Sequence, residues 1–555
     1  EMLTEEMTEG KTINVDSISG ATVTSEALVE GARAALESAG VNPDDYMTAV
    51  EAGEAEDVTM DADVVVIGAG GAGMTAAIVA ADAGKDVVIL ESQAMAGGNS
   101  VRSTGGMNAS KTKYQDENEF AEESGVEKTL ETAKNDYADN ETITALAATV
   151  QEQWHAYQAN PEGYFDSVEL MELDTMIGGK GINNPELVAT LAENSADAID
   201  WLSSIGAELT SVGAFGGASV KRIHRPVNEE GQTISVGSYV VPILEKTVED
   251  RGVEIVYEAT ANEILMEDGK AAGVVAEGAA GNTITVNASA VIIATGGFGA
   301  NNDMVKEQNA SLDGYVTTNA PGALGQGITM ATAEGIDAAT VDMDQIQLHP
   351  TVHVEGSNAA LITEGLRGDG AILVNQEGKR FTDEVGTRDA VSAAENEQTG
   401  GYAWLIVDQA MVDASAVIQG YIDKGYALEG ETYEELAEAM ETDAATFAET
   451  METWNAAVES KSDPEFNRTS FAEPLNTAPY YAIKVQPGIH HTMGGLVINT
   501  AAEVLNTSDE VIPGLFAAGE VTGGIHGNNR LGGNAVADFI VFGRIAGQSA
   551  ADYIG

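Results

Sequence analysis

Residues 61–91 read DADVVVIGAGGAGMTAAIVAADAGKDVVILE, and this stretch decides the fold. The β-branched run at 64–67 predicts a buried strand, and the alanine-rich run behind it predicts a helix. Between them stand three glycines in the G-x-G-x-x-G spacing, which are Gly68, Gly70 and Gly73. A second apolar run ends at Glu91, whose carboxylate can accept both hydroxyls of a ribose. The stretch therefore predicts an α/β domain that binds a dinucleotide with a free 2′-hydroxyl, FAD or NAD.

The bulk composition excludes several classes of function. The chain has 555 residues, too many for one core, and a formal charge of −63 from 89 acidic and 26 basic residues. This charge argues against nucleic acid or an anionic membrane as a partner, and an anionic substrate would need a locally positive cleft. The chain has no cysteine, which excludes disulfides, thiolate metal sites and iron–sulfur clusters.

The sequence shows no membrane span or signal peptide. No apolar run reaches the roughly 18 residues that a span needs, so we expect no transmembrane segment in this chain. The chain starts at Glu1 without a signal peptide, so we expect either a cytoplasmic protein or one whose targeting segment has been removed.

Residues 1–40 are too short for a complete domain. One interpretation is a turn followed by an amphipathic helix that Ser25 caps and that ends at Gly40. The run DSISGATVTS at 16–25 also resembles the motif at which FMN is joined by a phosphoester to a threonine in flavin-carrier domains of sodium-pumping and related redox complexes. That resemblance implies the C-terminal part of an FMN-binding domain with FMN on Thr22, Thr24 being the alternative acceptor.

Two glycine-rich loops suit a backbone that passes close to a flavin. The first, at 97–110, reads GGNSVRSTGGMNAS, and the second, at 291–299, reads VIIATGGFG. An ordinary irregular loop is the alternative for the first. Their candidate cofactor residues are Asn99, Ser100, Gly105, Gly106, Thr295 and Gly296. Elsewhere, acidic residues 41–60 predict a linker, residues 115–160 predict charged helices, and the apolar spacing from 184 to 205 predicts one packed helix.

Histidines and arginines gather in segments that lie far apart in the sequence. These segments read QLHPT at 347–351, LITEGLRGDGAILVNQEGKRFTDEVGTR at 361–388, GIHHTMGG at 488–495 and HGNNRLGGN at 526–534. A lone histidine usually has a structural role. Positive groups gathered beside glycine-rich turns in an acidic chain instead indicate an anion-binding cleft.

This arrangement resembles the flavoprotein family of fumarate reductases and succinate dehydrogenases, in particular the soluble flavocytochrome c type enzymes and their FMN-carrying relatives. The resemblance extends from 61 to 555. It implies an α/β fold with a Rossmann-like FAD-binding domain at 61–339 and 481–555 and an inserted α+β capping domain at 340–480. In membrane-bound members a histidine before the paired glycines holds FAD covalently, and Asn99 takes that position here. The resemblance therefore implies non-covalent FAD.

The resemblance also assigns roles to single residues. Arg388 matches the arginine that donates a proton to the substrate, and Glu364 and Arg367 match the relay that reprotonates it. An arginine is an unusual acid because its pKa exceeds about 12, so it can act only as a transient donor in a relay with Glu364. The residues that match the two carboxylate clamps are His349, Thr363 and Glu364 for one carboxylate and His490 and Arg530 for the other.

Further matches concern the flavin. His491 is expected on the flavin, the helix that starts near Asn534 can point its N-terminus at the flavin O2, and Glu520 resembles an acid that contacts the ribityl chain or adjacent backbone. Leu361 departs from the best-known soluble enzymes, which have a methionine there. Some members hold a sodium-like ion near Thr492, Met493, Gly494, Glu520 and Thr522, and no other metal is expected.

The sequence thus predicts FAD-dependent reduction of an α,β-unsaturated carboxylate, with fumarate as the first choice because both clamps are present. Reductases of urocanate, acrylate or aryl-acrylates and an oxidase resembling L-aspartate oxidase are alternatives in the same fold. A flavin-carrying electron-transfer module is the alternative outside enzymes. Electrons would arrive through FMN on Thr22 from a membrane-bound or carrier donor. That implies a place outside the cytoplasm, at the cell surface or in the periplasm, with the cytoplasm as the alternative.

Overall fold

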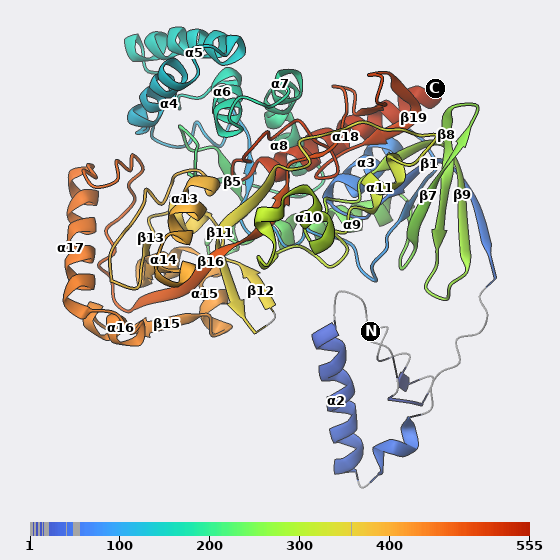
Figure 1. Cartoon of the computed structure of the whole chain (residues 1–555), viewed down its shortest axis with the longest axis horizontal. Coiled ribbons are helices and arrows are strands. Elements are labelled where there is room, and N and C mark those ends of the chain that lie inside the picture. Colours follow the sequence, from blue (N-terminus) through green and yellow to red (C-terminus); the bar gives the residue numbers. More distant parts are fainter. Residues whose placement is uncertain are drawn as a thin grey trace.

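The computed structural model describes residues 4, 7, 8, 11–13, 15, 22–39, 41–47, 56–356 and 358–555. Its main body has two large sheets with helices packed around them (Figure 1). None of the helices in the described ranges is long and apolar enough to cross a bilayer. The mixed α/β class predicted from the sequence is confirmed.

The larger sheet contains the predicted dinucleotide-binding unit. Its strand order is β18-β19-β9-β1-β2-β6, and β8 and β7 extend it from β9 as an antiparallel meander. β1 pairs in parallel with both β2 and β9, as expected for strands buried on both faces. The strands are β1 (Val58–Ile67), β2 (Val87–Leu90), β6 (Glu254–Val256), β7 (Thr260–Glu267), β8 (Lys270–Glu277), β9 (Thr283–Ile293), β18 (Glu503–Leu505) and β19 (Val511–Ala517).

The turn from β1 into α3 (Gly71–Asp82) requires glycine at two positions. Gly68 has a φ of +105°, a backbone conformation that residues with a Cβ rarely adopt. A Cβ on Gly73 would lie 1.9 Å from the carbonyl oxygen of Gly68. α3 therefore lies directly on the strand end, and α9 (Val236–Asp250) and α18 (Asn534–Ile554) pack on it.

The smaller sheet is antiparallel, with the order β12-β11-β16-β14-β13, and β15 also pairs with β16. Alternate residues of β14 enter different cores, because Leu405 packs with residues of α15 and Ile406 with residues of α17. The strands are β11 (Ile346–Glu355), β12 (Asn358–Leu361), β13 (Ile372–Val374), β14 (Ala403–Asp408), β15 (Ala427–Gly430) and β16 (Tyr480–Thr492). The helices around it are α13 (Arg388–Asn396), α14 (Gln409–Ala414), α15 (Ala416–Asp423), α16 (Tyr433–Ala439) and α17 (Ala444–Ser460).

Five helices follow the loop at 97–110. The first three stand apart from the sheets in Figure 1, whereas the last two pack against α18. The five helices are α4 (Glu123–Asp136), α5 (Glu141–Ala159), α6 (Val168–Gly178), α7 (Pro185–Glu193) and α8 (Ser195–Ser204). The single helix predicted over 184–205 is wrong. The chain forms two helices there. Asn194 separates them, because it is both the C-cap of α7 and the N-cap of α8.

The N-terminal segment contributes α2 (Thr22–Ser38) and the short helix η1 (Pro43–Tyr46). Ser25 lies inside α2 and not at its N-cap, so the predicted cap is wrong. Thr22 starts this helix, but its side chain and residues 16–21 lie outside the described part of the structure. The remaining short elements are β3 (Met107–Asn108), β4 (Ser211–Gly213), β5 (Ile223–Arg225), α10 (Asn302–Gln308), η2 (Ala310–Leu312), α11 (Gln326–Ala331), β10 (Thr340–Val341), α12 (Gly365–Gly368), η3 (Thr399–Gly401) and β17 (Gly495–Leu496).

Gly73→Ala should lower the unfolding temperature, because the added Cβ would meet the Gly68 carbonyl oxygen and force α3 away from β1. Overpacking of this kind costs about 1–3 kcal/mol. Gly420→Ala in α15 is the matched control, since no atom lies within 4 Å of its new Cβ and alanine favours a helix. Calorimetry should show a lower unfolding temperature for Gly73→Ala than for the wild type and Gly420→Ala. Equal unfolding temperatures in the three proteins would contradict this account.

Candidate active site

One continuous cavity joins the dinucleotide motif to the cluster of histidines and arginines. It begins where β1 turns into α3 and ends beside β11, β12 and β16. The predicted residues that line it are Gly68, Gly70, Glu91, Asn99, Ser100, Gly105, Gly106, Thr295, Gly296, His349, Leu361, Glu364, Arg388, His490, His491, Glu520 and Arg530. Of the residues predicted for the FAD and substrate sites, Gly73, Thr363, Arg367 and Asn534 do not line it. Thr22, predicted for FMN, has no described side chain.

At the first end of the cavity, Glu91 fixes the turn after β1. One of its oxygens accepts the N–H of Ala69 at 2.8 Å and the other accepts the N–H of Gln93 at 2.8 Å. Burial raises the pKa of Glu91, although these two backbone N–H groups oppose the shift. A carboxylate has about four lone-pair sites, so Glu91 can still accept further hydrogen bonds from the cavity.

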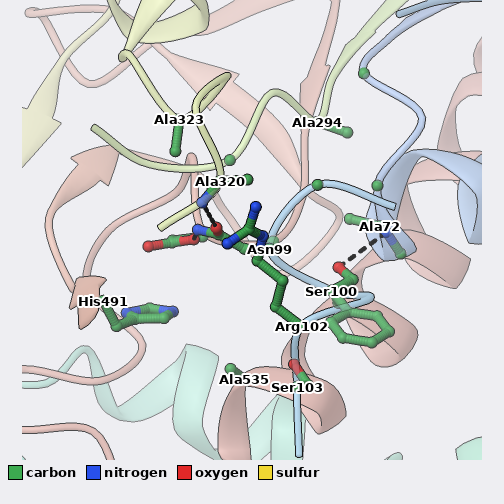
Figure 2. A pocket seen from close by; sticks show the side chains of 18 of the residues that line it. Ala72, Asn99, Ser100, Arg102, Ser103, Ala294, Ala320, Ala323, His491 and Ala535 are labelled. Carbon is green, nitrogen blue, oxygen red and sulfur yellow. Dashed lines mark hydrogen bonds between the residues drawn. The ribbon is translucent and has the colours of Figure 1, made fainter. Parts of the chain in front are cut away.

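Asn99 connects three loops around the middle of the cavity (Figure 2). Its amide donates to Asn319 Oδ1 at 2.6 Å and to Glu520 Oε2 at 3.0 Å, and its oxygen accepts the N–H of Ala320 at 2.7 Å. The neighbouring Ser100 hydroxyl accepts the N–H of Gly71 at 3.0 Å, at the N-terminus of α3. Asn99 thus holds the loop at 97–110 in place.

His491 lies across the cavity from Ser100, and Ala535 marks the start of α18 beside it (Figure 2). Burial lowers the pKa of His491 well below its usual value, and the charge of Arg530 adds to this shift. Its Nδ1 is buried without a hydrogen-bond partner among the described residues. Asn534, the first residue of α18, instead bonds to Asn108 and Thr175. The cavity therefore meets the N-terminus of α18 at Gly533 and Ala535, and not the Asn534 side chain that the sequence singled out.

At the far end of the cavity, Glu364 is shared by two arginines. Arg388 donates from Nε to Glu364 Oε2 at 2.9 Å and also contacts that oxygen through Nη2, while Arg367 donates to Oε1 at 3.0 Å. All three side chains are buried. Burial alone would raise the pKa of Glu364, but the two guanidinium groups outweigh it and hold that pKa below its ordinary value. Glu364 is therefore ionised and links Arg388, at the cavity, to Arg367 behind it.

Two histidines face the same end, with ring centres 5.0 Å apart. His349 Nδ1 accepts the backbone N–H of Thr351 at 3.2 Å, so the neutral ring carries its proton on Nε2. That Nε2 is buried without a partner in the described structure. The Thr318 hydroxyl lies 2.8 Å from His490 Nδ1 and orients the second ring. Burial lowers the pKa of both histidines well below the usual range, and Arg388 adds to the shift.

Arg530 differs from the other buried arginines of the site. It forms no ion pair within the described residues, its Nη1 donates only to the Leu531 carbonyl at 3.0 Å, and its Nε has no partner. Burial and the nearby charge of Arg388 lower the pKa of Arg530 to about 9. A buried cation without a carboxylate is costly, so this end of the cavity favours an anion.

Two residues of the site were missed from the sequence. Gln347 accepts from Arg388 Nη1 at 2.8 Å and donates to the Arg530 carbonyl at 2.7 Å, which fixes one arginine relative to the other. Its position two residues before His349 on a strand was the available signal, since such residues share a face. Arg102 also lines the cavity (Figure 2), but nothing distinguishes it in the sequence from an ordinary loop arginine.

A further buried carboxyl lies on α13, seven residues after Arg388. Glu395 is fully buried, and burial raises its pKa well above the ordinary value. Arg367 and the backbone N–H of Ala403 oppose this shift without cancelling it. Glu395 therefore holds a proton at a pH where Glu364 does not.

The chain is similar to known flavoproteins over nearly its whole length. The family described as "FAD binding domain" matches residues 63–165 and 154–536, and "FMN-binding domain" matches residues 3–37. "Fumarate reductase (cytochrome)" of Shewanella frigidimarina is 42% identical over 492 residues, which covers 88% of this chain and 77% of the relative.

A second relative matches nearly the whole of this chain within a longer protein. "NADH:fumarate oxidoreductase" of Klebsiella pneumoniae is 40% identical over 553 residues, and the match covers 99% of this chain. The chain spans only about half, 54%, of that relative. Among solved structures, the open conformation of a flavocytochrome c3 fumarate reductase gives a TM-score of 0.65 at 36% identity and covers 92% of this chain and 81% of that one.

Glu395→Gln should change how stability depends on pH. The raised pKa means that the native protein binds this proton more tightly than the unfolded chain does. The free energy of unfolding of the wild type therefore falls as pH rises from about 4.5 to the native pKa, by at most about 1.4 kcal/mol per pH unit. The substitution removes that fall, so the variant should gain stability relative to the wild type as pH increases.

Urea unfolding at about pH 5 and about pH 8 measures this difference. Glu397→Gln, an exposed change at the end of the same helix, is the control and should show no such pH trend. If the free energy of unfolding of Glu395→Gln differed from that of the wild type by the same amount at both pH values, Glu395 would not hold its proton more tightly in the native state.

Proposed function

The chain belongs to the fumarate reductase family of FAD-binding flavoproteins, and from this we propose that it reduces the C=C bond of an unsaturated dicarboxylate, fumarate to succinate. The proposal rests on the positive and hydrogen-bond-donating groups that line the far end of the cavity. Arg388, Arg530 and the Nε2–H of His349 all meet there, next to the dinucleotide site, and the described chain offers Arg530 no ion pair and that Nε2–H no acceptor. Such fixed positive groups stabilise the negative charge that develops on a carboxylate during reduction of the adjacent double bond.

The residues of the cavity fit FAD. Thr295 Oγ1 and His491 Nδ1 are buried polar atoms without partners in the described chain. Gly296 has a φ of +73°, and no atom of the described residues lies within 4 Å of where its Cβ would be, so the backbone there leaves room for a ligand. When bound, FAD would supply a hydride to one carbon of the double bond. Asn99 cannot form the bond through which a histidine holds FAD, so we propose non-covalent binding.

We assign the proton transfer to the chain's own residues. Arg388 gives a proton to the second carbon of the double bond, and Glu364 and Arg367 return a proton to it through their direct hydrogen bonds. Proton and hydride together add two hydrogens across the C=C bond. Because Glu364 is ionised and contacts both arginines, it can accept a proton from one and pass it to the other.

The two clamps give the site its preference for a dicarboxylate. We propose that His349 and Thr363 hold one carboxylate, and that His490 and Arg530 hold the other. The Thr363 hydroxyl accepts the N–H of Gly365 at 3.3 Å, so its own hydrogen remains available to a ligand. Glu364 belongs to the first clamp through the arginines that it orients, because both of its oxygens are engaged by them.

Reduction of a monocarboxylate such as urocanate, acrylate or an aryl-acrylate is the second candidate. Leu361 lines the cavity beside the first clamp, where the best-known soluble relatives have a methionine, and a shorter, branched side chain changes the shape of that wall. An oxidase resembling L-aspartate oxidase and an electron-transfer module without a substrate remain the alternatives outside alkene reduction.

We further propose that electrons arrive through FMN joined to Thr22, within the segment that matches an FMN-binding domain. A membrane-bound or carrier donor outside the cytoplasm would supply them. The division into an FAD-binding domain at 61–339 and 481–555 and a capping domain at 340–480 belongs to the same proposal. The separate sheets of β1 and β11 support two units. β16, which this division assigns to the second FAD-binding part, pairs with β11 and β14 in the smaller sheet.

Anaerobic oxidation of a chemically reduced viologen dye by the FAD-loaded protein tests the function. Fumarate, urocanate, acrylate and cinnamate are supplied in parallel. Turnover with fumarate and little with the others supports the two-clamp site. Turnover with a monocarboxylate instead favours the second candidate, and the absence of turnover with all four would leave the electron-transfer module.

Arg388→Ala should reduce kcat for fumarate by about 10²-fold or more, because the proton donor is lost, while FAD stays bound. The visible flavin spectrum measures bound FAD, and dye oxidation measures kcat. Arg251→Ala is the control, since Arg251 pairs with Asp82 at the surface. Full activity of Arg388→Ala would refute the assignment of Arg388 as the proton donor.

A further inference from the structure

Leu361, Ile362 and Thr363 form the short extended segment that brings the first clamp to the cavity. Leu361 lines the cavity, and Thr363 and Glu364 follow directly. A three-residue segment has few contacts of its own, so its position depends on what satisfies its backbone groups on each side.

One edge of this segment is held by β11. The N–H of Ile362 donates to the Thr351 carbonyl at 2.9 Å, and the Thr351 hydroxyl donates to the Ile362 carbonyl at 2.7 Å. The same Thr351 donates its backbone N–H to His349 Nδ1. This edge therefore ties the segment to His349 of the same clamp.

Within the described residues, no strand pairs with the other edge, and the phenol of Tyr421 bonds to the backbone there instead. The N–H of Thr363 donates to the Tyr421 oxygen at 3.0 Å, and the Tyr421 hydroxyl donates to the Leu361 carbonyl at 3.2 Å. In a parallel ladder, one residue bonds the carbonyl of residue i−1 and the N–H of residue i+1 on the facing strand. Tyr421 makes the same two bonds with a single hydroxyl group.

The Tyr421 hydroxyl forms these two hydrogen bonds, whereas its ring packs in the core. Its ring is buried, with 5% exposure, in the cluster that contains Ile362 and Leu366. Burial raises the pKa of Tyr421 to about 12, so the hydroxyl keeps its proton and can donate to Leu361 at any ordinary pH. A hydroxyl in an apolar core is unfavourable unless it is hydrogen-bonded.

We propose that Tyr421 is a positioning residue for the substrate clamp. Its hydroxyl fixes the backbone of Leu361 at the wall of the cavity and the backbone of Thr363 beside it, and it thereby sets the affinity for the carboxylate that Thr363 is proposed to bind. This inference rests on the proposed function. Tyr421 itself lies behind the segment, on α15, and reaches the clamp through the backbone groups of Leu361 and Thr363. The side chain of Thr104, which lines the cavity, also interacts with the Tyr421 hydroxyl.

Tyr421→Phe removes the two hydrogen bonds and keeps the ring. KM for fumarate should rise about 5- to 10-fold, the factor that corresponds to a buried hydrogen bond, while kcat stays within about 2-fold. Amide hydrogen exchange of the FAD-loaded protein, read by mass spectrometry on peptides that contain residues 361–363, should be about tenfold faster at Thr363, because its N–H loses its acceptor.

Tyr426→Phe is the matched control. The Tyr426 ring stacks near Tyr421 at 6.4 Å between centres, and its hydroxyl makes no hydrogen bond within the described chain. This variant should keep both the KM and the exchange rate of the wild type. A Tyr421→Phe protein with unchanged KM, or with a reduced kcat at unchanged KM, would overturn the positioning role.

The exchange measurement separates this inference from the proposed function. Exchange at Thr363 that is the same in Tyr421→Phe and the wild type would overturn the anchoring, whatever the substrate. Faster exchange in Tyr421→Phe alone would support it. A wild-type protein that reduces none of the alkenoates would overturn the proposed function instead, and with it the effect on KM.

Discussion

The hydrogen bonds of Glu364 to Arg388 and Arg367 are the interaction on which the site depends. Taking guanidinium groups out of water costs several kcal/mol per ion even after the structure relaxes. A carboxylate shared between two of them offsets part of this cost, and the same contact keeps that carboxylate ionised. Without it, Arg388 would face Arg530 and Arg367 across a buried space with no anion between them.

The other buried arginines show what is unusual about Arg530. Arg222 bonds to Asp166 and Asp174, and Arg380 and Arg468 share Glu384. Each of these arginines has a carboxylate of the protein beside it, as a folded core requires. Arg530 has none among the described residues, although the chain carries 89 acidic side chains. The structure thus leaves one buried cation for an anion that comes from outside, and it places that cation in the cavity that also takes the dinucleotide.

The sequence was sufficient to predict the parts of the fold that depend on local sequence patterns. The run at 61–91 predicted β1, α3 and β2, because a buried apolar strand, a glycine turn and an alanine-rich helix each have a physical signature. Most of the candidate site residues line the cavity because they stand beside glycine-rich turns where strands end. The sequence could not predict that Asn534 faces Asn108, since a residue at a helix N-terminus can point to either side.

The sequence also could not predict contacts between segments that lie far apart along the chain. Tyr421 and Leu361 are 60 residues apart, and nothing in the sequence around Tyr421 marks it as the partner of a strand edge. Gln347 is a similar case, because its role depends on where Arg388 and Arg530 meet. The hydrogen bonds of Tyr421 form only when α15 packs beside β12 in the unit of the smaller sheet. Those of Gln347 also need the segment before α18, which carries Arg530.

The most direct test of the account compares two substrates that differ in one group. Crotonate has the trans double bond and one carboxylate of fumarate, with a methyl group in place of the second carboxylate. If Arg530 and His490 hold that second carboxylate, kcat/KM of the FAD-loaded protein should be about 10³-fold or more higher for fumarate, because crotonate leaves buried polar groups unpaired. Equal values of kcat/KM for the two acids would contradict the account.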